Sequence, residues 1–162
     1  MIAHRWRWFT IIVASCVLFS GVWVWRHSTL IEPAPAEVGP GQVEVVAHTS
    51  WQLESLTVAD EYTDETVPFW TPSKALPGAK LVIARIRYTA SDQFSCSVWV
   101  QGDQRRWTTF GISSENSSCY GDSDGTMLIA AQVPASAVDE VRGVLLMVHK
   151  PSREILLLGS VE

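Results

Sequence analysis

The sequence predicts an all-β protein: an antiparallel β-sandwich of about seven or eight strands, preceded by one N-terminal transmembrane helix. Three observations lead to this fold class. An uncharged apolar run fills residues 8–25, a period-two alternation of apolar and polar residues begins after Gln42, and turn residues separate the alternating runs. Short strands with turns between them and almost no helix are typical of a β-sandwich.

The apolar run over residues 8–25 predicts a membrane anchor. A helix needs roughly 20 apolar residues to cross a bilayer, and it satisfies its own backbone there. A buried helix of a soluble domain is a poorer interpretation, because the run has no polar face. Amphipathic rings favour both membrane interfaces, and tryptophans mark both ends of the run: Trp6, Trp8, Trp23 and Trp25.

The charges beside the anchor predict its orientation. Arg5 and Arg7 precede the run, together with His4, whereas Arg26 alone follows it. Because positive flanks stay in the cytoplasm, residues 1–7 are expected to be a cytoplasmic tail. The protein is then a single-pass protein of the cell membrane with an extracytoplasmic C-terminal domain.

Two alternatives remain open for the same segment. Val13-Ala14-Ser15-Cys16 resembles the lipobox of bacterial lipoproteins, in which the cysteine is lipidated and the preceding chain removed. A cleaved signal peptide is the other. The apolar residues 17–19 disfavour a lipoprotein, whose mature chain turns polar at this point. All three interpretations place the rest of the chain outside the cytoplasm.

Residues 26–42 are predicted to be a Pro-rich linker and residues 43–162 the domain. Pro33, Pro35 and Pro40 favour an extended, semi-rigid spacer. From residue 27 onward, nine Lys and Arg stand against seventeen Asp and Glu, a net charge of −8. This acidic balance argues against nucleic acid as a partner.

The domain is expected to hold a series of short strands. Those over residues 80–90, 126–133 and 143–149 carry the most apolar residues and are assigned to central positions. In the first, Arg85 and Arg87 mark the solvated face, and the opposite face is predicted to be apolar: Val82, Ala84, Ile86 and Tyr88. The second also has one apolar side: Met127, Ile129, Ala131 and Val133. The apolar phase slips between Leu53 and Leu56, which predicts a β-bulge near Ser55 or a break into two strands. Pro77-Gly78 predicts a turn. The other predicted elements are strands over residues 43–48, 51–58, 96–101, 106–112 and 154–158, and a helical turn over 134–140.

This layout resembles the small membrane-anchored, immunoglobulin-like extracellular domains of Gram-positive bacteria, a family of unknown function. The matching features are the anchor with its Pro-rich spacer, the Pro77-Gly78 turn before a long apolar strand, and Met127–Val133 running into Pro134. The resemblance implies an immunoglobulin-like sandwich and a non-enzymatic binding or envelope module. It transfers no functional residues, because the antibody-type spacing of cysteine and tryptophan is absent.

Cys96 and Cys119 are predicted to form a disulfide. They are the two cysteines outside the membrane segment, and the predicted compartment is oxidising. The loop that carries Cys119 is too polar to hold itself in place, and the bridge is worth about 3 kcal/mol. Two unpaired thiols are the alternative.

No motif predicts catalysis, a cofactor or a metal. Asp122-Ser123-Asp124-Gly125 is similar to the start of a calcium loop, but the later glutamate is missing. His48 and His149 lie on or beside strands without a nucleophile motif. The sequence therefore predicts a protein that is not an enzyme.

The long loop over residues 60–79 is the candidate binding segment. Phe69 and Trp70 stand between two prolines, and rigid aromatic side chains make good contact anchors. The alternative is that both rings cap the core. The first functional hypothesis is a protein-interaction module in an envelope or membrane complex. The second is a module that binds peptide or glycan through Trp70, Tyr62 and Trp107. The sequence predicts neither the partner nor the oligomeric state.

Overall fold

A computed structural model of the chain describes residues 15–17, 20, 34–46, 48–63, 73–112, 119–121, 123–149 and 152–161. The chain divides into two compact units, Met1–Ala34 and Pro35–Glu162. In the first unit, Ser15–Val17 and Ser20 are helical, and the Ser20 hydroxyl donates to the Cys16 carbonyl at 2.8 Å. Within the described residues, no helix has the length and apolar character needed to span a membrane. The predicted anchor and its four interface tryptophans lie almost wholly outside these residues and stay a prediction.

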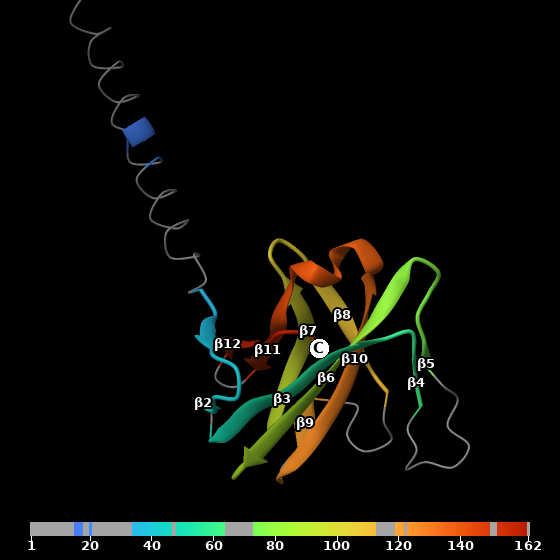
Figure 1. Cartoon of the computed structure of the whole chain (residues 1–162). Coiled ribbons are helices and arrows are strands. Elements are labelled where there is room, and N and C mark those ends of the chain that lie inside the picture. Colours follow the sequence, from blue (N-terminus) through green and yellow to red (C-terminus); the bar gives the residue numbers. More distant parts are fainter. Residues whose placement is uncertain are drawn as a thin grey trace, which may run out of the picture. The chain divides into compact units, whose positions relative to one another are not determined.

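The second unit is built from strands (Figure 1). The described residues form twelve strands, more than the predicted seven or eight: seven have six residues or more, and five have only two or three. Of the five short strands, only Glu44–Val46 falls within a predicted strand, the one over residues 43–48. The elements in chain order are β1 (Ala36–Val38), β2 (Glu44–Val46), β3 (Thr49–Ala59), β4 (Glu61–Tyr62), β5 (Ser73–Lys74), β6 (Ala79–Ala90), β7 (Phe94–Gly102), β8 (Arg106–Gly111), β9 (Tyr120–Gly121), β10 (Gly125–Pro134), the 3-10 helix η1 (Ala135–Glu140), β11 (Val141–His149) and β12 (Ser152–Leu158).

The strands form two layers that share β8. One layer, here the β11 layer, has the order β1-β12-β11-β7-β8, and the other, the β6 layer, has the order β8-β10-β6-β3-β2. The first half of β8 pairs with β7 and the second half with β10, so this strand turns from one layer into the other. The predicted central strands β6, β10 and β11 do have strands on both sides. The fold is therefore a β-sandwich, antiparallel except for the parallel pair β1 and β12.

Alternation along the strands places one apolar face of each layer in the interior. On β6, Val82, Ala84, Ile86 and Tyr88 point into the main core, as the sequence predicts. The opposite face of β6 is only partly solvated. The first half of this face belongs to a second group of buried residues, here called the outer cluster. Its members are Leu81, Ile83, Ile112, Leu128 and Ala130. Strands β4 and β5 belong to the segment that covers this cluster, with Tyr62 and Ala75 packed against it.

The turn chemistry explains where β3 and β6 begin. Gly78 has φ +78°, and the Ala79 N–H donates to the Leu76 carbonyl at 2.9 Å, so Pro77-Gly78 forms the predicted turn. His48 has φ +63° and turns the chain from β2 into β3. The register between β3 and β6 shifts between Leu53 and Ser55, which confirms the predicted bulge.

The predicted linker over residues 26–42 is too long. Ala36–Val38 form β1 and pair in parallel with Ile155–Leu157 of β12, and the Val38 side chain is buried. The sheet therefore begins before the predicted boundary at residue 43. A strand of three residues between Pro35 and Gly39-Pro40 carries too few residues to show a period.

Two buried polar groups in β3, the Thr49 hydroxyl and the Trp51 indole N–H, have no hydrogen-bond partner, and removal of the first is expected to stabilise the domain. The Thr49 side chain is fully buried, and its hydroxyl makes no hydrogen bond. We expect Thr49→Val to raise the free energy of unfolding by about 1 kcal/mol, because the desolvation cost of the hydroxyl disappears. Denaturant unfolding measures this, with the exposed Thr89→Val as the control. The expectation is contradicted if Thr49→Val lowers the free energy of unfolding and Thr89→Val does not.

Candidate functional site

A cleft between the two layers is the candidate site. It has a volume of about 360 Å³ and lies where β3 of the β6 layer faces the end of β12 in the β11 layer. This volume falls within the usual range of ligand pockets, at its lower end. The lining comes from the turn before β2, from the bulged part of β3, from β6 and from the residues at and after the end of β12: Pro40, Gly41, Gln52, Leu53, Glu54, Ser55, Leu56, Arg87, Leu158, Gly159 and Ser160.

Three local features keep the cleft in place. The Gln52 side-chain amide donates to the Gly41 carbonyl at 2.9 Å and ties β3 to the turn before β2. The Gly159 N–H donates to the Arg142 carbonyl at 3.0 Å and holds the chain after β12. A Cβ atom at Gly159 would come within 2.6 Å of Leu53, so glycine allows the two layers to approach closely at this point.

The bulge gives the cleft its charged side. Glu54 is the extra residue of β3, and it forms an ion pair with Arg87 on β6. The Arg87 side chain is 63% exposed and the Glu54 side chain 21% exposed. Ser55 and Ser160 add hydroxyl groups, while Leu53, Leu56 and Leu158 add apolar surface. The cleft therefore offers apolar contacts and polar groups in one place.

Of the four aromatic residues predicted to bind, the structure describes Tyr62 and Trp107, which pack against different clusters. Tyr62 packs against the outer cluster, whereas Trp107 packs against the main core. The Trp107 ring lies so close to Gly102 that a Cβ atom there would come within 2.8 Å of it. Phe69 and Trp70 lie outside the described residues, and their role stays a prediction. The role of Tyr62 and Trp107 in binding also stays a prediction.

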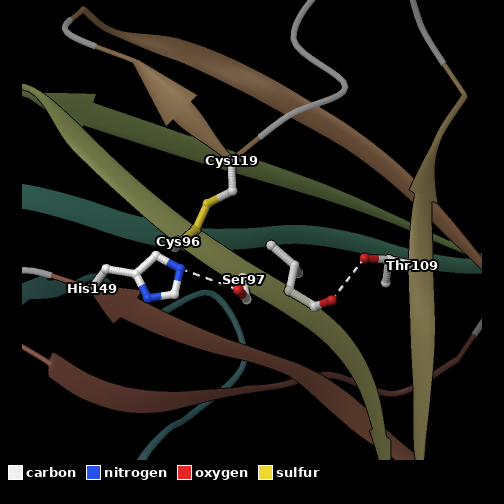
Figure 2. The surroundings of a disulfide bond; sticks show 6 residues. Cys96, Ser97, Thr109, Cys119 and His149 are labelled. Atoms are coloured by element: carbon white, nitrogen blue, oxygen red, sulfur yellow. Dashed lines mark hydrogen bonds between the residues drawn. A yellow bond between two sulfur atoms is a disulfide. The ribbon is translucent and has the colours of Figure 1, made fainter.

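The predicted disulfide between Cys96 and Cys119 is present (Figure 2). Cys96 lies on β7, and its N–H donates to the Cys119 carbonyl at 2.9 Å. Directly after Cys119, strand β9 pairs with the start of β7. The bridge and this short ladder together fasten the chain before β10 to the β11 layer. Cys16 is free and exposed.

A serine and a histidine meet beside the disulfide. The Ser97 hydroxyl lies 3.1 Å from Nε2 of His149 across strands β7 and β11 (Figure 2). Ser97 alternates with Cys96 and Val98, which pack against the core, so the pair lies on the outer face of the layer. No carboxylate among the described residues bonds to His149. The contact links two neighbouring strands on this face.

Within the part of the chain that the structure describes, no group of three or more His, Cys, Asp or Glu side chains could hold a metal ion.

The sequence predicts the bulge that shapes the cleft but not the cleft itself. The phase slip near Ser55 was visible in the sequence. The approach of Gly159 and Ser160 to β3 depends on residues about one hundred positions away, and no local pattern reports it.

No protein-family model matches the chain, and no curated protein is similar to it. Among solved structures, the chain is similar to an uncharacterized β-sandwich protein from Clostridium difficile 630, with a TM-score of 0.49 and 10% sequence identity. The similarity covers 80% of this chain and 97% of that chain. At 10% identity, the similarity does not indicate which residues form a site.

Proposed function

We propose that the chain is a membrane-anchored protein-interaction module whose β-sandwich binds a protein partner of the cell envelope. The anchor over residues 8–25 and its basic N-terminal flank support the location outside the cytoplasm. The Cys96–Cys119 disulfide also supports it, because such bonds persist in oxidising compartments. We also propose that the sandwich is of the immunoglobulin-like type, as in the small membrane-anchored extracellular domains of Gram-positive bacteria that the sequence resembles.

The cleft is the observation that carries this proposal. It combines apolar side chains, two hydroxyl groups and an ion pair, and it opens at the side of the sandwich where the layers are not joined by β8. Contacts of this mixed kind suit a polypeptide, which presents backbone polar groups and apolar side chains together. Glycan binding through stacked aromatics is less favoured, since Tyr62 and Trp107 pack against different clusters.

Photo-crosslinking from the cleft tests the function. We expect p-benzoylphenylalanine in place of Ser160, in the full chain in its native membrane, to give a discrete protein adduct. The same residue in place of Ser152 is the matched control, because Ser152 is also an exposed serine of the β12 segment but does not line the cleft. The expected yield of the adduct is at least tenfold higher from Ser160. Equal adducts at both positions, or no protein adduct at Ser160, would contradict the proposal.

A further inference from the structure

We propose that the partner enters the cleft as an extended segment and joins the β6 layer as an added strand along the free edge of β3. This inference rests on the proposed function and names how the partner is held. On the side of β3 that faces away from β6, strand β2 pairs only with Thr49–Trp51. From Gln52 to Ala59, no described residue pairs with that side of β3.

The ladder between β3 and β6 shows which backbone groups point to the free edge. Hydrogen-bonded and non-hydrogen-bonded pairs alternate along an antiparallel ladder. The Ser91 N–H donates to the His48 carbonyl at 3.2 Å, so this pair and every second pair after it are bonded. Thr49 and Trp51 then direct their N–H and C=O groups away from β6. Strand β2 lies on that side of β3 and pairs with Thr49, Ser50 and Trp51.

The same alternation continues beyond the bulge. It is counted along β6, because the extra residue Glu54 belongs to β3. The bonded pairs beyond the bulge are those of Ser55 and Thr57. Leu56 and Val58 pair with β6 without such bonds, and their N–H and C=O groups point to the free edge. An added strand would satisfy these groups.

Beyond the bulge, the free edge of β3 lacks the charged residues and prolines that usually block an edge strand. Natural edges carry charged residues or proline, which prevent pairing with another chain. Glu54 and the bulge occupy one end of the free edge, and the four residues Leu56–Ala59 after them hold no charge and no proline. The stretch from Leu53 to Ala59 is about 20 Å long at the usual rise of a strand, enough for a segment of about six residues.

The cleft also indicates the chemistry of the partner segment. Side chains of an added strand alternate between the two faces of the layer. Those on the inner face would contact Leu53, Leu56 and Leu158, and a cleft of about 360 Å³ leaves room for small apolar groups. Those on the outer face would lie beside the ion pair of Glu54 and Arg87. The segment is therefore an extended peptide in which small apolar and polar residues alternate.

A displayed library of random dodecapeptides is the probe. It is selected on the full chain in detergent and depleted on the Ser160→Trp variant, whose indole ring fills the cleft. We expect the surviving peptides to alternate small apolar with polar residues over about six positions. The strand-addition proposal is overturned if no peptide survives the depletion, or if the surviving peptides lack this alternation.

Amide hydrogen exchange with one selected peptide then tests the mode of binding. The exchange rates of the Leu56 and Val58 amides are expected to fall at least tenfold when the peptide is bound. The Ser55 and Thr57 amides, which already bond to β6, serve as internal controls and are expected to keep their rates. Slowing at all four amides alike, or at none, overturns strand addition. A Ser160 crosslink that persists in that case leaves the interaction function intact, so the two proposals fail separately.

Discussion

Replacing Gly143 with alanine is expected to lower the free energy of unfolding by about 3 kcal/mol or more. Gly143 lies at an irregularity of β11, where the register with β7 shifts between Val141 and Gly143. A Cβ atom there would come within 2.0 Å of the Leu157 carbonyl oxygen and 3.0 Å of the Leu158 Cα atom. Both are backbone atoms of the neighbouring β12, so relief requires the ladder between the two strands to open. Overpacking of this kind is among the costlier single substitutions.

Gly78→Ala is the matched control for this effect. Gly78 has φ +78° and Gly143 has φ +157°, so alanine is strained by the backbone at both positions. At Gly78, however, no heavy atom lies within 4 Å of the added Cβ. The control is expected to lose only about 1–2 kcal/mol. Denaturant unfolding of the full chain measures both variants, and equal losses would show that the clash with β12 does not matter.

The parts of the fold that the sequence predicts are those set by local alternation. The strands β6 and β10 have long alternating runs, and their interior faces agree with the predicted ones. The bulge near Ser55 was also predictable, because an extra residue changes which side chains face the core. In these elements the pattern of apolar residues contains the structural information.

The parts that were missed depend on contacts between distant residues. Leu81 and Leu128 lie on faces expected to be solvated or left unassigned, yet both are buried in the outer cluster. Tyr62 and Ala75 pack against this cluster and help to bury it. The alternation of apolar residues along the chain does not indicate this contact. The parallel pairing of Ala36–Val38 with β12 joins residues more than one hundred positions apart. The cleft belongs to the same class, since β3 and the end of β12 form it together.

Hydrogen bonds at the outer cluster show how such a contact is held without an apolar pattern. The Gln132 side chain on β10 accepts from the Leu76 N–H and donates to the Lys74 carbonyl, each at 3.1 Å. Lys80 forms an ion pair with Asp60 at 2.7 Å. One glutamine therefore satisfies two backbone groups of the segment that covers β6. A lone polar residue in a strand gives no sign in the sequence that it has this role.

Removing the disulfide by the double substitution Cys96→Ala and Cys119→Ala is expected to cost about 3 kcal/mol. The two cysteines are 23 residues apart, and a bridge that closes a loop of this size restricts the unfolded chain by about that amount. The ladder between β7 and β9 spans only two residue pairs and would remain as the fastening of the chain before β10. The melting temperature should fall by roughly 10 °C.

Cys16→Ala provides the control, because Cys16 is free and exposed and its removal is expected to leave the melting temperature unchanged. Alkylation of the denatured, unreduced full chain tests the bridge directly. Protein taken from its native membrane should react at Cys16 alone, or at no cysteine if Cys16 is lipidated or its segment removed. Reaction at Cys96 and Cys119 in that material would contradict both the bridge and the oxidising compartment proposed for the domain. A stable double variant together with a fully oxidised native protein would instead show that the bridge forms there without supporting the fold.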